Sequence, residues 1–356
     1  MSSLGTLTPA IHSPVRFPAT RYQGSKRKLA STIVEQLGDL EFTTVLDAFG
    51  GTGAVAYALK QLGKCVTYND ILAFNHQIGL ALIENDSVQF DAEEIGTIGL
   101  RRDGVSYGDS IERTFSEIYF TDEENRWLDI AVGNIQRIEN RYRRAIAWFA
   151  LFQSAMAKRP YNLFHRSNLY MRTADVSRSF GNKAAWDRSF EEHFRQFARE
   201  SNAAVIDGGG GCRAICRDAL DVEPAFDLVY IDTPYINRAG VGVDYHQFYH
   251  FLEGMVCYEE WPALIDDRFK HRPLARINQP WSDPRLCGEM FRKLFARYRH
   301  SILIVSYRSD GIPTIDELAI MLRTVKRRVQ VIDGPLYQYA LSTNLRSREV
   351  LLIGQD

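Results

Sequence analysis

The sequence predicts an α/β fold built on a mainly parallel sheet, and three features carry this prediction. Residues 226–231 form a mostly apolar run bounded by prolines, as expected for a strand buried on both faces. Residues 43–49 form a second strand pattern, which leads through a glycine turn into a helical pattern. A third strand pattern follows at 65–68. Open α/β sheets bind ligands at the carboxyl ends of their strands, so the residues placed there are candidate site residues.

The composition is that of a globular protein. Its 356 residues suit roughly two domains, and 45% of them are hydrophobic and 24% charged. No apolar run reaches the length of a membrane span and no secretion signal is evident, so we expect a cytoplasmic protein without a membrane partner. The five cysteines form no CxxC pair, which argues against disulfides, and we predict no metal site.

The amino-terminal part predicts a helix with a basic beginning. Tyr22 and Lys26 lie in the segment that opens it, Ser25 is a candidate N-cap, and Gly38 is a natural end. From the residues alone, a solvated basic helix start explains this segment as well as a ligand contact does.

The glycine turn after the first strand predicts a site where the backbone approaches a ligand. Asp47 and Phe49 precede Gly51 and Gly53, and Asp70 ends the next strand about 20 positions later, where a carboxylate suits a ribose diol. The same spacing satisfies a dinucleotide-binding fingerprint, so a nicotinamide oxidoreductase remains an alternative at this point.

The middle of the chain is strongly basic. Residues 141–190 contain ten Arg or Lys and two Asp, a local excess of +8 within a chain whose net charge is −1. Cations, amides and aromatic residues interleave over 158–172, as expected where phosphates and base edges are contacted. The expected DNA contacts are Lys158, Arg159, Asn162, Arg166, Asn168 and Arg172. A solvated basic loop is the alternative interpretation.

Four residues at the end of the strand 226–231 carry the predicted chemistry. Asp232 offers a carboxylate, and Thr233 precedes Pro234 and is therefore biased toward an extended backbone that projects its carbonyl beside that carboxylate. Two acceptors and the neighbouring ring of Tyr235 suit a planar base with an amino group, which donates to both acceptors and stacks on the ring.

Further elements are expected on both sides of this tetrapeptide. The strand patterns lie at 212–216, 301–307 and 329–332, a hairpin at 337–341 and 349–353, and the helical patterns at 122–144, 141–152, 186–197, 245–255, 287–299 and 314–325.

Asp232-Thr233-Pro234-Tyr235 resembles the Asp-Pro-Pro-Tyr motif of the DNA adenine methylase family, the alpha-type N6-adenine-specific DNA methyltransferases. Thr233 departs from that motif: it keeps the backbone carbonyl but loses the fixed φ of proline. The spelling from Asp47 to Gly53 also resembles the family's glycine motif. The order of parts is that of the alpha arrangement, with a target-reading region between the two halves.

The resemblance implies a Rossmann-like S-adenosylmethionine-dependent methyltransferase sheet with a mainly helical target-recognition insertion. It implies that Tyr22 and Lys26 close over the cofactor, that Asp218 contacts its adenine, and that Asp232 faces both cofactor and substrate. We expect a cofactor-binding half at 17–85, the insertion at 86–205 and a catalytic half at 206–356.

The expected activity is transfer of a methyl group to the N6 amine of adenine in double-stranded DNA by base flipping. A companion restriction endonuclease is a candidate partner, and the sequence gives no oligomeric state. The alternatives are a nicotinamide oxidoreductase, which leaves the basic insertion without a purpose, and a DNA-binding relative that has lost catalysis.

Overall fold

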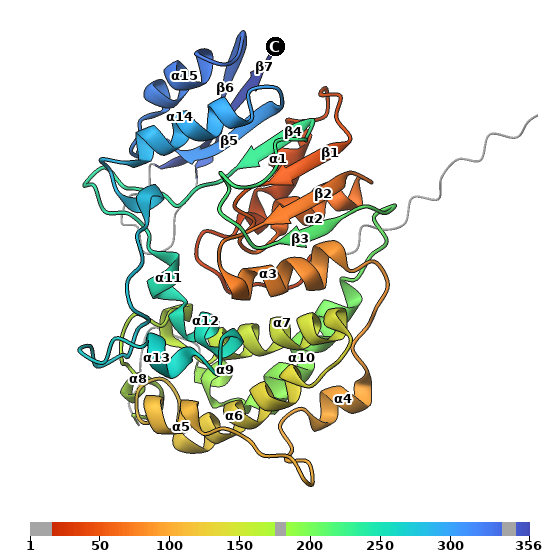
Figure 1. Ribbon diagram of the computed structural model, residues 1–356, viewed down its shortest axis with the longest axis vertical. Helices are drawn as coiled ribbons and strands as arrows, with labels where there is room; N and C mark the ends of the chain where they lie inside the picture. The colour runs from red at the N-terminus through yellow and green to blue at the C-terminus, as the bar shows by residue number, and fades with distance from the viewer. Residues whose placement is uncertain (1–15, 175–182, 337–346) are drawn as a thin grey trace, which may run out of the picture.

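The computed structural model describes residues 16–174, 183–336 and 347–356, and it confirms the α/β class (Figure 1). A seven-stranded sheet forms its centre. The strands are β1 (Thr44–Asp47), β2 (Cys65–Asn69), β3 (Arg213–Ile215), β4 (Leu228–Ile231), β5 (Ile302–Arg308), β6 (Arg328–Leu336) and β7 (Arg348–Gln355). Each lies within or beside a segment that the sequence assigned to a strand.

The strand order is β3-β2-β1-β4-β5-β7-β6. β1 pairs in parallel with β2 and β4, β2 with β3, and β4 with β5, whereas β7 runs antiparallel between β5 and β6. The chain moves outward from β1 to β3 and then returns to β4, so the direction of winding switches between β1 and β4. A ligand crevice is expected beyond the carboxyl ends of the strands at such a switch.

The central strands are buried on both faces, as their apolar runs predict. Val45 and Tyr230 belong to a core that also contains side chains of α1, α2 and α3. Leu46 and Val229 point the other way, into a core formed with α14 and α15. Because neighbouring side chains of a strand alternate between faces, β1 and β4 need apolar residues at successive positions.

Helices and helical turns cover the sheet and build a layer beside it. They are η1 (Lys26–Lys28), α1 (Ala30–Glu35), α2 (Ala54–Gln61), α3 (Ala73–Gly79), η2 (Leu80–Glu84), α4 (Ala92–Thr97), α5 (Ser110–Phe115), α6 (Asp122–Gln136), α7 (Arg141–Ala157), η3 (Pro160–Asn162), α8 (Tyr170–Thr173), α9 (Lys183–Asp187), α10 (Phe190–Ala203), α11 (Tyr245–Phe248), α12 (His250–Val256), α13 (Trp261–Leu264), η4 (Pro280–Ser282), α14 (Cys287–Arg297) and α15 (Ile315–Arg323).

The helical layer lies beneath the sheet in Figure 1 and contains more of the chain than the expected insertion. Helices α4 to α10 form most of it, but α12 and α13 join it from the segment that we assigned to the catalytic half. The ring of Phe115 lies 5.0 Å from that of Phe251 and 4.9 Å from that of Trp261, centroid to centroid. The division at residues 86 and 205 remains a proposal.

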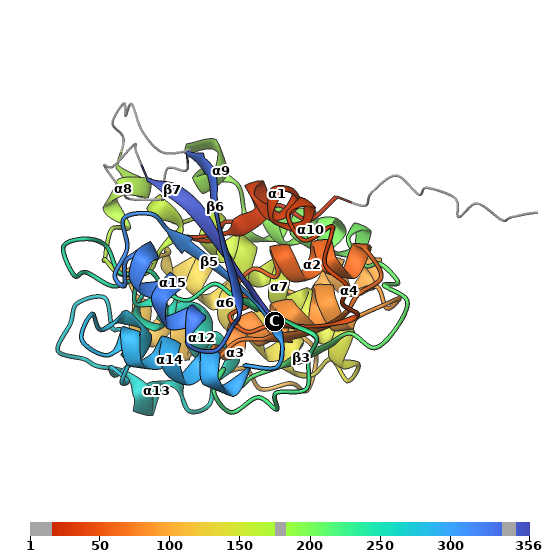
Figure 2. The same ribbon diagram turned by 90° about the horizontal axis from the view of Figure 1, so that it is seen from above.

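Several expected elements differ in the structure. The helical pattern at 122–144 ends at Gln136 as α6 before α7 begins at Arg141, and the pattern at 186–197 falls across α9 and α10. The helix expected at 245–255 is divided into α11 and α12, and the terminal hairpin is formed by β6 and β7, whereas residues 337–341 lie outside the described residues. Figure 2 shows β6 and β7 crossing the molecule together, with α14 and α15 side by side. Within the described residues no helix combines the length and apolar character that crossing a membrane requires.

Candidate active site

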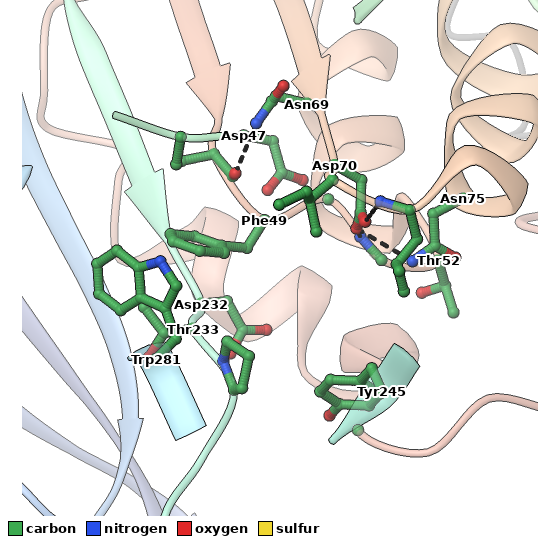
Figure 3. Close-up of a pocket in the computed structure, with 18 of the residues that line it drawn as sticks. Asp47, Phe49, Thr52, Asn69, Asp70, Asn75, Asp232, Thr233, Tyr245 and Trp281 are labelled. Atoms are coloured by element: carbon green, nitrogen blue, oxygen red, sulfur yellow. Dashed lines mark hydrogen bonds between the residues drawn. The ribbon is translucent and has the colours of Figure 1, made fainter. Parts of the chain in front are cut away.

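A cleft opens at the switch between β1 and β4, where the sequence placed its site residues (Figure 3). Its empty volume is about 1130 Å³ including the open mouth, enough for a nucleotide-sized cofactor. The predicted site residues that line it are Tyr22, Lys26, Asp47, Phe49, Gly51, Asp70, Asp218, Asp232, Thr233, Pro234 and Tyr235. Gly53 does not line it and lies one step behind, as the N-cap of α2.

The glycine turn forms one wall of the cleft and needs its glycines. Gly51 and Gly53 have φ values of +51° and +74°, a region that other residues rarely adopt. A Cβ on Gly50 would lie 2.1 Å from Cε2 of Tyr68, so this turn tolerates no side chain there. The Gly51 amide donates to Oδ2 of Asp70 over 2.9 Å, which links the turn to the end of β2.

Asp47 and Asp70 are buried carboxyls beside this turn. Oδ1 of Asp47 has no hydrogen-bond partner within the described residues, and burial together with the charges of Asp232 and Asp70 raises its pKa to about 8. Burial also raises the pKa of Asp70, although this carboxylate accepts from Gly51, from the Leu72 amide and from the Asn75 side chain. The cleft therefore holds unbalanced acceptors and favours a cationic ligand.

Asp232 ends β4 within a buried network that contains two carboxylates and one ammonium. The Lys26 ammonium donates to Oδ1 of Asp232 over 2.8 Å and also to the hydroxyl of Tyr235. That hydroxyl lies 2.6 Å from Oδ1 of Asp232 and 3.0 Å from Oε1 of Glu349. Burial raises the pKa of Asp232, while Lys26 opposes the shift. Two donors thus converge on one oxygen of Asp232.

Thr233 and Tyr235 have different surroundings. The Thr233 side chain is buried, and its backbone carbonyl accepts no hydrogen bond from the part of the chain that the structure describes. The carbonyl thus remains an available acceptor. The Tyr235 residue is only 5% exposed, and its ring packs at a right angle to that of Tyr307, with centroids 5.2 Å apart. The expected open stacking surface on Tyr235 is therefore not what the structure contains.

Several residues of the site were not predicted from the sequence: Trp281 and Tyr245 line the cleft, and Glu349 is buried behind it against Tyr235. Glu349 comes from β7, the last strand, and also accepts a hydrogen bond from the Ser306 hydroxyl over 2.5 Å. Trp281 lies beside Phe49 with ring centroids 5.0 Å apart, and Figure 3 shows the pair on the same side of the cleft as Asp232. Tyr245 faces them from α11. Of these residues, only Trp281 had a recognisable signal in the sequence, as an aromatic residue between two prolines.

Tyr22 and Asp218 both line the cleft. The Tyr22 ring lies nearly parallel to those of Tyr245 and Tyr249, at centroid distances of 5.5 and 4.6 Å, and these two rings are 6.4 Å from each other. Asp218 is half-buried at the far end of the cleft and accepts a hydrogen bond from the Leu220 amide within its own turn. Both can reach a ligand without a rearrangement of the sheet.

The residues expected to contact DNA divide into two groups. Lys158, Arg159, Asn168 and Arg172 are buried, with exposed fractions of 2%, 1%, 6% and 7%. Lys158 and Arg172 form ion pairs with Glu124. The charge count assumed that these cations lie at the surface, but their partner, Glu124, belongs to helix α6 of the helical layer. Buried side chains do not reach phosphates, so our expectation for these four is revised.

Asn162 and Arg166 remain at the surface of the same loop. Arg166 is exposed and Asn162 is half-buried. Two aromatic residues accompany them, Tyr161 with an exposed fraction of 56% and Tyr170 with 64%. The outer face of the loop is therefore basic and aromatic, although more of the cations in this region are buried on its inner face.

The sheet order and the cleft beside the glycine turn together define a Rossmann-like methyltransferase fold. The family model of D12 class N6 adenine-specific DNA methyltransferases matches residues 22–260. The chain belongs to this family and is a site-specific DNA methyltransferase acting on adenine. The oxidoreductase alternative is thereby excluded.

Individual relatives agree with this assignment. The chain is 30% identical over 351 residues to the type II methyltransferase M2.HphI of Haemophilus parahaemolyticus, covering 95% of this chain and 97% of that one. It is 24% identical to the modification methylase StsI of Streptococcus sanguinis over 93% of this chain, which spans only 50% of StsI. The solved rRNA methyltransferase aviRa of Streptomyces viridochromogenes shares 13% identity over 96% of this chain and 89% of its own, with a TM-score of 0.29 too low to support any argument.

Proposed function

We propose that the methyl donor is S-adenosylmethionine and that Asp232-Thr233-Pro234-Tyr235 holds an adenine flipped out of double-stranded DNA. The family establishes the activity, whereas this proposal assigns the cofactor and the residues. The observation that carries it is the pair of acceptors at the end of β4, the Asp232 carboxylate and the Thr233 carbonyl, which lie in one cleft with the glycine turn.

The charge of the cleft supports this cofactor. Four carboxyl groups, of Asp47, Asp70, Asp218 and Asp232, line it against two permanent cations, Lys26 and Arg217, and one oxygen of Asp47 lacks a partner within the described residues. S-adenosylmethionine brings a sulfonium and an amino group, and both cations are favoured beside carboxylates. The pyrophosphate of a dinucleotide would be repelled. When bound, the cofactor supplies an electrophilic methyl group.

The assignments to the cofactor follow the walls of the cleft. We assign Asp47 and the backbone from Phe49 to Gly51 to its amino-acid part, and Asp70 to the ribose hydroxyls. Gly53 acts indirectly, because its conformation starts α2 and shapes the turn. Asp218 is assigned to the adenine ring. Tyr22, whose ring lies against those of Tyr245 and Tyr249, closes the open side of the cleft.

The assignment to the target amine follows from the hydrogen bonds of Asp232. Lys26 and Tyr235 both lie on Oδ1, which fixes the plane of the carboxylate and directs Oδ2 toward a second donor. The amine of adenine has two N–H groups, one for Asp232 and one for the Thr233 carbonyl. Holding both hydrogens withdraws the nitrogen lone pair from the ring and aligns it for attack, which is catalysis by orientation.

Tyr235 takes a different role from the one that its position suggests. Its hydroxyl joins Asp232 to Glu349, and its ring is covered by protein. We therefore propose that Tyr235 positions the carboxylate, and that the half-buried ring of Tyr245 supplies the apolar surface against the flipped base. Stacking offsets the few kcal/mol that extrusion of a base costs.

The substrate is proposed to approach the outer face of the loop 159–171, where Arg166 and Asn162 are accessible. The relatives named as modification methylases and type II methyltransferases favour a companion restriction endonuclease as a functional partner.

Transfer of tritium from labelled S-adenosylmethionine to duplex DNA tests the proposal, followed by nucleoside analysis. The expected product is N6-methyladenine. A thermal-shift comparison tests the cofactor separately: S-adenosylhomocysteine should stabilise the protein and NADH should not. Stabilisation by NADH alone would contradict the assignment.

A further inference from the structure

One half-buried carboxylate, Glu124, whose side chain is 18% exposed, fixes both ends of the loop 159–171. Arg172 donates to it twice, over 2.7 and 2.9 Å, and the Lys158 ammonium lies 2.8 Å from Oε1. Lys158 also donates to the Trp186 carbonyl over 2.8 Å. The residue before the loop and the residue after it therefore meet at one point on α6.

The electrostatic surroundings of Glu124 indicate a strong interaction. Burial alone raises the pKa of this carboxyl, but the hydrogen bonds and charges of Arg172 and Lys158 outweigh it and hold the pKa below its usual value. Lys158 and Arg172 are 2% and 6% exposed at their side chains, so solvent screens these contacts little. Bidentate pairing of Arg with a carboxylate also fixes direction.

A third buried cation supports the interior of the loop. Arg159 donates to the carbonyls of Leu163 and Arg166, at 3.2 and 2.9 Å, and its guanidinium lies 4.4 Å from the centre of the Tyr119 ring. The Tyr119 hydroxyl donates to the Phe164 carbonyl over 2.5 Å. The inner side of the loop is thus held at its two ends and at its centre.

The outer side presents the groups suited to nucleic acid. Tyr161 and Asn162 have φ values of +64° and +58°, a strained conformation that persists only where the surroundings impose it. Tyr161 is exposed in this conformation, as is Arg166 in the same loop. Relaxation of the loop would release both residues and remove this arrangement.

We propose that Glu124 is a positioning residue for target recognition: it holds the loop 159–171 in the shape that presents Tyr161, Asn162 and Arg166 to DNA. This inference rests on the proposed contact between the loop and DNA. Lys158, Arg159 and Arg172 then act from inside the protein and do not touch phosphates.

The proposal and simple electrostatics predict opposite changes in DNA affinity for one substitution. Glu124→Gln removes a negative charge beside a basic loop, so electrostatics alone predicts tighter binding of DNA. Loss of the shape predicts the opposite. Glutamine keeps the capping box with Thr121, because its amide oxygen can still accept from the Thr121 amide, and helix α6 should therefore persist.

The experiment measures binding of a duplex that contains the site which the enzyme methylates, by fluorescence anisotropy at several salt concentrations. Binding of S-adenosylhomocysteine is measured separately by calorimetry. Glu124→Gln should weaken DNA binding by about tenfold, since small displacements of contacting groups are costly. Its salt slope and its affinity for S-adenosylhomocysteine should not change. Glu123→Gln is the matched control: the same charge change on an exposed neighbour of the same helix should not weaken binding.

Two results would overturn the proposal. Unchanged or tighter DNA binding by Glu124→Gln would show that the loop keeps its shape without this carboxylate. A salt slope reduced by about 0.9 in Lys158→Met or Arg172→Gln would show that these cations bind phosphates directly.

A further variant keeps the proposal testable if Glu124→Gln fails to fold. If Glu124→Gln also loses S-adenosylhomocysteine binding, Arg172→Lys is measured, which keeps every charge and loses only the bidentate contact. Weaker DNA binding with intact S-adenosylhomocysteine binding supports the proposal. Unchanged DNA binding, or loss of both ligands, overturns it.

Arg166→Ala and Tyr161→Ala separate this inference from the proposed function. If neither variant alters DNA binding, the contact between loop and DNA is refuted. If they weaken binding and Glu124→Gln does not, the contact stands and only the role of Glu124 is refuted.

Discussion

Cofactor binding should depend on pH through Asp47. In the free protein, burial and the nearby charges of Asp232 and Asp70 raise the pKa of Asp47 to about 8, so this carboxyl is mostly neutral below that pH. A cationic ligand favours the ionised form and lowers the pKa again. At pH 6, about two units below the free value, only about 1% of the protein has the ionised carboxylate. The dissociation constant of S-adenosylmethionine should therefore be about 100-fold larger at pH 6 than at pH 9.

Calorimetry without DNA measures this effect, because the cofactor is not consumed when the methyl acceptor is absent. Affinity should rise with pH up to about 8 and then level off. Titrations at pH 6.5 in buffers of different ionisation enthalpy should show release of about one proton per cofactor bound. Asp47→Asn should bind weakly with little pH dependence. If the wild-type affinity does not vary with pH, or if Asp47→Asn retains the full variation, the reasoning about this carboxyl is refuted.

Two further substitutions test the buried network behind the cleft and the glycine turn that lines it. Glu349→Gln removes the charge 3.5 Å from the Lys26 ammonium while keeping an acceptor, so methyl transfer should slow by about 10- to 100-fold with cofactor affinity nearly unchanged; an unaltered rate in a single-turnover assay would contradict the role of this network. Gly50→Ala places a Cβ 2.1 Å from the Tyr68 ring, so it should lower unfolding stability by about 1–3 kcal/mol and weaken cofactor binding, measured by chemical denaturation and calorimetry. Gly96→Ala, whose added Cβ meets no atom within 4 Å, is the control: it should leave cofactor binding unchanged and should not lower unfolding stability, because alanine favours helix α4 more than glycine does.

The sheet and the cleft were largely predictable because local patterns determine them. An unbroken apolar run such as 226–231 is required of a strand with cores on both faces, and a glycine turn after a strand marks the place where backbone meets ligand. The carboxyl ends of neighbouring parallel strands share one edge. Asp47, Asp70 and Asp232 could therefore be placed together although they are far apart in the sequence.

Contacts between distant segments were not predictable in the same way. Glu349 reaches Tyr235 from 114 positions later, and the short segment around it resembles any buried strand. Arg172 pairs with Glu124, 48 positions earlier, so a count of local charge assigned it to the surface. The burial of Tyr235 also depends on packing against Tyr307 of β5, which its own motif does not encode.

The central claim is that Asp232 binds the target amine and is required for methyl transfer, beyond any contact that it makes with the cofactor. The most direct measurement is methyl transfer by Asp232→Ala, with binding of S-adenosylhomocysteine determined by calorimetry on the same preparation. The account predicts that transfer of labelled methyl groups to DNA is lost while the cofactor product still binds. Retained transfer by this variant would contradict the account.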